Sequence, residues 1–243
     1  MAVLARADLA PWPDGYERWF QAVPGITGVL AATLGVWLSW RLARRHADPR
    51  SAGVAALAMW LGSSAIYYSL ISPGYSHAAS MMTAALFFFY CADSRRPPSV
   101  RRSFALGALA GLAALMRWQD AIFLSVPILE SLVRRTGWRD RLLTGVAAGI
   151  GWLLAFSPQM VVWQVLYGQA LAVPQGPSFM RWTAPHLLDV LMSTNHGLFT
   201  WTPIVVFGVV GLGTVEGPDV DHIGFRPDLR AKFFGEVEVI FVQ

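Results

Sequence analysis

The fold is decided by residues 142–167, which read LLTGVAAGIGWLLAFSPQMVVWQVLY and contain no Asp, Glu, Lys or Arg. A helix that crosses a membrane needs about 20 mostly apolar residues, because the hydrocarbon core is about 30 Å thick. This charge-free run continues to residue 180, and two further stretches, 51–92 and 190–215, also lack Asp, Glu, Lys and Arg. The sequence therefore predicts an all-α fold, a polytopic transmembrane helical bundle.

The composition supports this class of protein. Of the 243 residues, 55% are hydrophobic and only 14% are charged, whereas soluble domains have about 25% charged residues. The formal net charge is +4, but the arginines lie in short clusters between apolar segments, which argues against nucleic-acid binding. Cys91 is the single cysteine, so an internal disulfide is excluded.

Seven apolar segments are predicted, and the arginines orient them. The segments are residues 25–42, 51–72, 77–92, 103–116, 121–133, 142–167 and 198–213. Twelve arginines follow the first, third and fifth segments, whereas only Arg6, Arg18, Arg117 and Arg181 fall on the other side. The positive-inside rule therefore places the arginine-rich side in the cytoplasm and the N-terminus outside.

The chain divides into three predicted parts. Residues 1–24 form an outer-face segment, residues 25–213 form the bundle, and residues 214–243 form a polar tail in which charged residues are much denser. Residues 1–24 contain no apolar run of signal-peptide length that would deliver an outside N-terminus. We therefore expect a fragment of a longer membrane protein, with a non-native or frame-shifted tail as one explanation of the composition break.

The turn at residues 116–120, Met-Arg-Trp-Gln-Asp, is the first candidate site. The apolar segments on either side have about 14 and 13 residues, so each is about 20 Å long and shorter than the hydrocarbon core. Arg117 and Asp120 then lie near or below the outer membrane surface, where ionisable side chains usually serve function. Arg117 is a predicted substrate-binding residue and Asp120 a candidate catalytic acid. The alternative is a structural ion pair between the two.

Two further polar stretches lie on the predicted outer face. Pro and Gly in residues 72–77 end one segment, and His77 begins the next with Ser80 one turn further on. Tyr75 and His77 are predicted to bind substrate, because a helix N-terminus suits an anionic group. The alternative is a helix cap with aromatic side chains in the interfacial belt. His196 is the fourth predicted binding residue, and its Asn-His-Gly context also fits an ordinary turn.

Three motifs follow one another along the chain: PGYSHAAS at residues 73–80, LMRWQD at 115–120 and GLFTWTP at 197–203. Over residues 14–213 they resemble bacterial membrane glycosyltransferases of the GT-C class, near protein mannosyltransferases, aminoarabinose transferases and lipopolysaccharide sugar transferases. The resemblance implies sugar transfer from a polyprenyl-phosphate donor to an acceptor hydroxyl, with Arg117 near the donor phosphate and His77 assisting. The family's usual catalytic Asp lies in the first outer loop, which this chain is expected to lack. Asp14 does not stand in that motif.

The sequence thus predicts an integral, multi-pass glycosyltransferase of the inner (plasma) membrane, with its active face toward the periplasm or the extracellular side. The expected partners are the lipid bilayer and a lipid-linked sugar donor, and nucleic acid is not among them. No cofactor or metal-ligand spacing is indicated, and a divalent cation stays open. The alternatives are a membrane transporter or lipid flippase, in which Arg117 and Asp120 form a relay, and an inactive truncated relative.

Overall fold

A computed structural model describes residues 17–92, 99–133, 137–172, 186–195 and 197–214. Within these ranges the chain is helical and has no strand, which confirms the all-α prediction. The elements are α2 (Arg18–Ala43), α3 (Pro49–Leu61), a π-helical turn η1 (Tyr67–Ile71), α4 (Ser76–Cys91), α5 (Val100–Met116), a 3₁₀ helix η2 (Trp118–Leu124), α6 (Ser125–Val133), α7 (Trp138–Tyr167), α8 (Leu187–Met192), α9 (Leu198–Trp201) and α10 (Ile204–Thr214).

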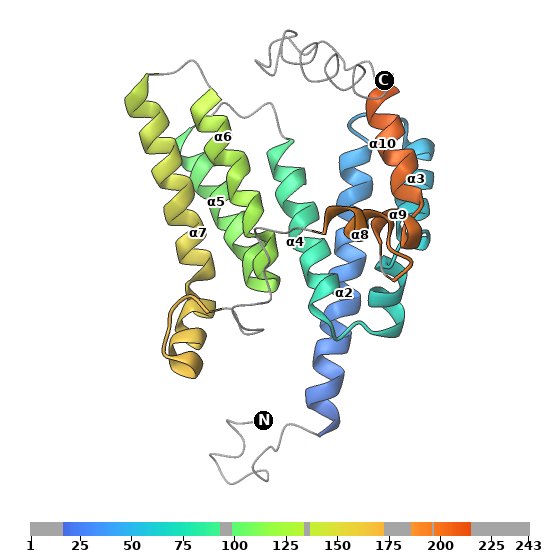
Figure 1. Cartoon of the computed structure of the whole chain (residues 1–243). Coiled ribbons are helices and arrows are strands. Elements are labelled where there is room, and N and C mark those ends of the chain that lie inside the picture. The colour runs from blue at the N-terminus through green and yellow to red at the C-terminus, as the bar shows by residue number, and fades with distance from the viewer. Residues whose placement is uncertain (1–16, 93–98, 134–136, 173–185, 196, 215–243) are drawn as a thin grey trace.

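The long helices stand side by side in the order α7, α5, α4, α2 and α3 (Figure 1). The C-terminal ends of α2 and α4 and the N-terminal ends of α3, α5 and α7 lie at the same end of the molecule, at the top of Figure 1. This end carries the described members of the arginine clusters. The opposite end carries the connections between η1 and α4 and between α5 and η2. Arginine-rich and arginine-poor connections therefore alternate between the two ends of the bundle, in the order predicted from the sequence.

Glycines allow α5 and α7 to approach closely. A Cβ atom at Gly107 would overlap the carbonyl of Ala148, and one at Gly151 would overlap the carbonyl of Phe104. A Cβ at Gly111, one turn beyond Gly107, would lie 2.5 Å from the carbonyl oxygen of Trp152. Small residues spaced four apart are typical of helix contacts inside membranes, where close backbone packing replaces the hydrophobic effect. The contact fixes the end of α5, from which the turn at Arg117 projects.

Two described helices, α2 and α7, are long and apolar enough to cross a membrane. Only 28% and 22% of their most apolar stretches are buried in the described structure. Large apolar side chains of these two helices point outward, such as Val165 on α7, 78% exposed, and Trp19 on α2, 66% exposed. A signal sequence would explain α2, which lies near the N-terminus, but not α7. The other predicted segments fall on described helices of 17 residues or fewer, so seven spans remain a prediction.

Three of the predicted segments are not continuous helices in the structure. Residues 51–72 divide into α3 and η1, because α3 ends at its C-cap Gly62. Just beyond it, the Ser63 hydroxyl accepts a hydrogen bond from the backbone N–H of Ala65. Residues 121–133 begin as the 3₁₀ helix η2 and become α-helical only in α6. Residues 198–213 divide into α9 and α10 at Pro203, which has no backbone N–H to continue α9.

The predicted boundary at residue 24 falls within a helix, and the division into an outer segment and a bundle stays a prediction. Helix α2 begins at Arg18, and Pro24 lies inside it. The apolar sequence on both sides continues the helix, and this part of α2 packs on the η1–α4 connection, where a Cβ at Gly74 would lie 3.8 Å from Pro24. The rest of the predicted outer segment, residues 1–16, and all but residue 214 of the predicted tail lie outside the described residues.

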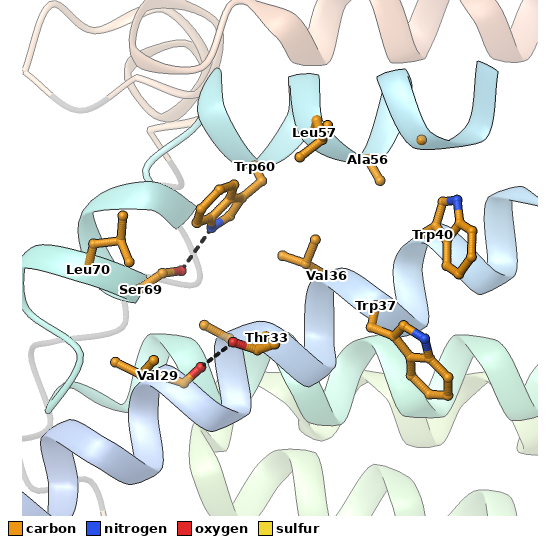
Figure 2. Close-up of a pocket in the computed structure, with 12 residues that line it drawn as sticks. Val29, Thr33, Val36, Trp37, Trp40, Ala56, Leu57, Trp60, Ser69 and Leu70 are labelled. Carbon is orange, nitrogen blue, oxygen red and sulfur yellow. Dashed lines mark hydrogen bonds between the residues drawn. The ribbon is translucent and has the colours of Figure 1, made fainter. Parts of the chain in front are cut away.

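An apolar crevice of about 450 Å³ lies between α2 and α3 (Figure 2). Its end near η1 is closed by a hydrogen bond of 3.1 Å from Trp60 Nε1 to Ser69 Oγ. Its residues are Val29, Ala32, Thr33, Val36, Trp37, Trp40, Gly53, Ala56, Leu57, Trp60, Ser69 and Leu70. Nearly all of these side chains are apolar, so the crevice suits a hydrocarbon more than a polar ligand.

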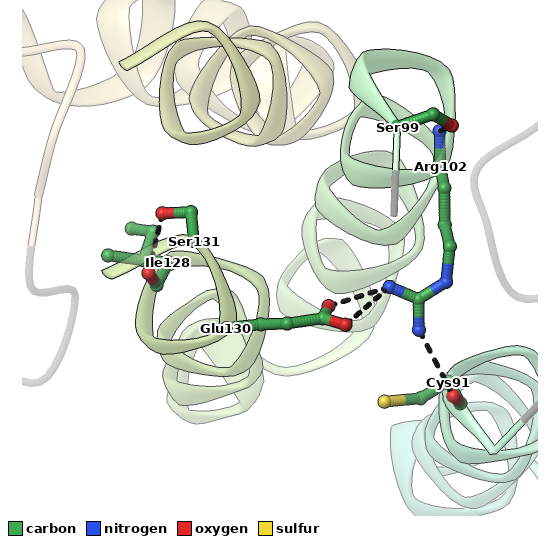
Figure 3. Close-up of polar contacts among 6 residues, drawn as sticks. All are labelled: Cys91, Ser99, Arg102, Ile128, Glu130 and Ser131. Atoms are coloured by element: carbon green, nitrogen blue, oxygen red, sulfur yellow. Dashed lines mark hydrogen bonds and ion pairs between the residues drawn. The ribbon is translucent and has the colours of Figure 1, made fainter. Parts of the chain in front are cut away.

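A buried ion pair joins three helices at the arginine-rich end (Figure 3). Arg102 Nη1 lies 2.8 Å and 2.6 Å from the two carboxylate oxygens of Glu130 on α6, and its Nη2 donates to the carbonyl of Cys91 on α4 at 3.2 Å. Arg102 is only 7% exposed. This arginine is among the twelve used to predict topology, and the structure gives it a packing role that its place in a cluster does not indicate.

Candidate functional site

Two of the predicted polar stretches meet at the end of the molecule opposite the arginine clusters. Helix α4 begins immediately after the Pro73–Gly74 turn, with Tyr75 extended at its N-cap. Helix α5 ends at Met116, and the following Arg117 is extended, with its N–H still bonded to the carbonyl of Ala113 at 2.9 Å. The chain then turns into η2, which points the side chains of residues 117 and 120 toward α4.

The contacts between these stretches are two side-chain hydrogen bonds. Arg117 Nη1 lies 2.9 Å from His77 Nδ1, and the Ser80 hydroxyl donates to Asp120 Oδ2 at 2.6 Å. Both pairs are separated by 40 residues in sequence, so one turn of α4 is aligned with one turn of η2. We call His77, Ser80, Arg117 and Asp120 the polar cluster.

Aromatic rings border the polar cluster on the η1 side. The ring of Tyr68 stacks on the imidazole of His77, with centroids 3.8 Å apart and planes 17° apart. Tyr75 contacts Tyr68 edge to face at 6.1 Å and is 63% exposed. The predicted residue Tyr75 therefore lies at the rim, whereas Tyr68, which the sequence analysis missed, touches His77. Its only sequence signal is an aromatic residue shortly before the Pro-Gly turn.

The turn that carries Arg117 is anchored on α7. The indole of Trp118 packs in a cluster with Ala114, Phe156 and Trp163. Its Nε1 is buried and has no hydrogen-bond partner within the described part of the chain. A large, partly buried ring next to Arg117 limits the movement of the turn, because the ring would have to leave this packing if the turn shifted.

The described contacts do not pair Arg117 with Asp120, as the alternative interpretation of a structural ion pair requires. Each side chain bonds to a residue of α4, and no salt bridge joins the two across the ranges that the structure covers. Both residues are partly exposed. The predicted binding residue His196 lies outside the described residues. The part of its loop that is described is held by a hydrogen bond of 2.8 Å from Trp201 Nε1 to the carbonyl of Thr194.

The polar cluster combines an anion-binding group with a carboxylate. A guanidinium has five N–H donors, and the bond to His77 uses one of its nitrogens, so others remain for a ligand oxygen. Asp120 accepts from Ser80 through one oxygen, which leaves the second as an acceptor. No group of three or more His, Cys, Asp or Glu side chains that could hold a metal ion occurs among the described residues.

Comparison of the chain with protein-family models, curated proteins and solved structures finds no match. The geometry of the polar cluster and the apolar surface around it are therefore the features that bear on function.

Proposed function

We propose that the chain is part of a GT-C-like membrane glycosyltransferase that binds a polyprenyl-phosphate sugar at the polar cluster. The observation that carries the proposal is the contact between the two motifs, through Arg117 with His77 and Asp120 with Ser80. A cationic donor and a carboxylate held within one turn of each other suit a phosphate leaving group and a hydroxyl nucleophile.

Arg117 is proposed to bind the donor phosphate. When the sugar–phosphate bond breaks, negative charge grows on the phosphate oxygens, and a guanidinium already in position stabilises this charge. The contact with His77 and the anchoring of Trp118 hold Arg117 in place before substrate arrives. Loss of a preorganised donor of this kind typically lowers the rate by about 10²–10³-fold.

Asp120 is proposed as an assisting carboxylate near the acceptor hydroxyl. Its contact with Ser80 directs one carboxylate oxygen toward α4, and the second oxygen can accept a hydrogen bond from a hydroxyl group. The resemblance places the main catalytic Asp of such enzymes in a preceding outer loop, so Asp120 is not assigned that role.

The proposed membrane position rests on the exposed apolar surface and the arginine distribution. Helix α7 presents apolar side chains over its whole length, including Ile150, Leu154 and Val161. The described arginine clusters lie at the end opposite the polar cluster, which favours a polar cluster on the periplasmic or extracellular side of a multi-pass bundle.

The test compares Arg117→Gln with Arg139→Gln in membranes that contain the full chain. Arg139 lies at the other end of the molecule, with its Cζ 5.6 Å from the ring of Trp138, so this control removes the same charge. Radiolabelled polyprenyl-phosphate hexoses and pentoses are supplied, and label transferred to acceptors is counted. We expect Arg117→Gln to lose binding of the donor and any transfer by about 10²-fold or more, and Arg139→Gln to retain both.

Carbonate extraction verifies that each variant stays inserted. Equal donor binding by Arg117→Gln and the unchanged chain would overturn the proposed role of Arg117. Movement of a fluorescent polyprenyl phosphate between leaflets without any sugar transfer would instead favour a lipid flippase.

A further inference from the structure

A cationic pocket lies at the arginine-rich end, away from the polar cluster. Its volume is about 310 Å³, and it is lined by Arg41, Arg44, Arg45 and Phe89. The three arginines are exposed and occupy the last turn of α2 and the residues just after it. Phe89 comes from the last turns of α4, so the pocket lies where these two helices end together.

Aromatic rings hold the three guanidinium groups in place. The Cζ atom of Arg45 lies 4.1 Å from the ring centroid of Phe89, and its Nη1 donates to the Phe89 carbonyl at 3.1 Å. The Cζ atom of Arg41 lies 5.3 Å from the ring of Trp37. That of Arg44 lies 4.9 Å from the ring of Trp40. Cation–π contacts of this kind orient a guanidinium but leave its charge unneutralised.

The described residues provide no carboxylate for this pocket. The nearest described acid in sequence, Asp48, accepts hydrogen bonds from the backbone N–H groups of Arg50 and Ser51 at the start of α3. Glu130 pairs with Arg102. Three positive charges therefore share one pocket with no anion from the described chain, an arrangement that favours binding of an external anion.

The cationic pocket adjoins the apolar crevice between α2 and α3. Trp37 and Trp40, the two rings beneath Arg41 and Arg44, also line the crevice, and Figure 2 shows both rings at one end of its α2 wall. A ligand that filled both spaces would have an anionic group next to a hydrocarbon chain. A free phosphate ion would leave the crevice empty, and a fatty chain without a charge would leave the arginines without an anion.

We propose that this composite site binds an anionic phospholipid, with its phosphate at Arg41, Arg44 and Arg45 and an acyl chain in the crevice between α2 and α3. The pocket lies on the arginine-rich side, which the positive-inside rule assigns to the cytoplasmic leaflet, where anionic lipids attract basic clusters. The lipid fills the space between α2 and α3 and links them. This site is independent of the proposed sugar transfer.

The first experiment tests the headgroup. The full chain is purified in a mild detergent, and retained phosphatidylglycerol and phosphatidylcholine are counted by native mass spectrometry. We expect phosphatidylglycerol to bind more tightly, and the triple variant Arg41→Gln, Arg44→Gln and Arg45→Gln to lose affinity by up to about 100-fold, since each basic residue near an anionic lipid contributes roughly fivefold. Its control is Arg101→Gln with Arg139→Gln and Arg141→Gln, which removes the same charge at the same end.

The second experiment tests the acyl chain. A Cβ at Gly53 would meet only Trp40 Nε1, at 3.8 Å, so Gly53→Leu places a side chain in the crevice without disturbing the backbone. Gly149→Leu is its control, because a Cβ there meets nothing within 4 Å. We expect Gly53→Leu, but not Gly149→Leu, to weaken binding of phosphatidylglycerol about tenfold.

Three results would overturn the proposal. Equal retention of phosphatidylglycerol and phosphatidylcholine by the unchanged chain would exclude an anionic-lipid site, whether or not the triple variant folds. Equal losses in the triple variant and its charge-matched control would show a general charge effect. Competition by glycerol phosphate as strong as that by phosphatidylglycerol, with no effect of Gly53→Leu, would show a site for free phosphate.

Discussion

Arg102→Met removes one partner of the ion pair that joins α4, α5 and α6. The substitution keeps a long side chain at a position that is 7% exposed and leaves the Glu130 carboxylate, 26% exposed, without its partner guanidinium. Glu130→Leu removes the carboxylate instead, so the deeply buried Arg102 guanidinium keeps its hydrogen bond to the Cys91 carbonyl but loses its ion pair. The two single variants therefore probe unequal halves of the same pair.

The expected magnitudes follow from this difference in burial. Breaking a buried ion pair by removing one partner costs about 3–5 kcal/mol of stability. The Glu130 carboxylate is 26% exposed and reaches some water, so we expect Arg102→Met to cost about 2 kcal/mol. In Glu130→Leu the charged group that remains is the Arg102 guanidinium, which has little access to water. Its Nε is already buried without a partner among the described residues, so we expect Glu130→Leu to cost about 4 kcal/mol. The double variant, which leaves no buried charge, costs about 1 kcal/mol or less.

The assay is reversible unfolding in mixed micelles, with increasing dodecyl sulfate and tryptophan fluorescence as the readout. Arg101→Met is the matched control, because Arg101 is an exposed arginine beside Arg102 on α5. We expect the control to change stability by less than about 0.5 kcal/mol. Losses of the two single variants that simply add in the double variant would refute the reasoning, because residues that form one pair must show coupling.

Three further predictions test other parts of the structure. In a cysteine-free background, a cysteine at Gly74 should react with an impermeant thiol reagent from outside and one at Gly137 only after permeabilisation; the reverse pattern would invert the topology. Gly107→Val should separate α5 from α7 and lower the thermal midpoint by several degrees, whereas Gly149→Val, in open space, should not. Hydrogen bonds from the Ser51 hydroxyl and from backbone N–H groups hold the pKa of the Asp48 carboxyl below its ordinary value. The stabilising effect of Asp48 is therefore complete above that ordinary pKa and is lost as the pH falls through the lower folded-state pKa. The measurement is the difference in unfolding free energy between the unchanged chain and Asp48→Ala, followed from about pH 6 to about pH 2. This difference should shrink at the acid end of the range and not before.

Helix positions could be predicted where apolar runs are long and end in clear signals. Helix α3 begins at Pro49, two residues before the predicted start, and α7 runs from Trp138 to the predicted end at Tyr167. The break after α9 has a sequence signal in Pro203, whereas the break at residues 62–66 lies within a uniformly apolar or uncharged stretch and could not be predicted. Periodicity carries little information when almost every residue is hydrophobic, since all faces of a helix then look alike.

The members of the candidate site could be named from the sequence, but their pairing could not. Arg117, Asp120 and His77 stand out as polar residues in predicted turns. Which one meets which depends on the vertical register between α4 and α5, set by side-chain packing such as that of Phe87 and Leu106 in one buried cluster. The burial of Arg102 is a similar case, because it depends on Glu130, 28 residues away.

The contact between Arg117 and His77 fixes the tautomer of the imidazole. A guanidinium carries only N–H donors, so Nδ1 of His77 must act as the acceptor, and in the neutral ring the proton then resides on Nε2. The stack with Tyr68 holds the ring plane and thus the direction of that Nε2–H bond. His77 thereby becomes a second oriented donor beside Arg117, and a ¹⁵N spectrum of the imidazole would show two distinct nitrogens in fixed roles. In the proposed function, a donor phosphate would meet N–H donors from both α4 and the turn after α5, and the Asp120 carboxylate would be the acceptor in the cluster.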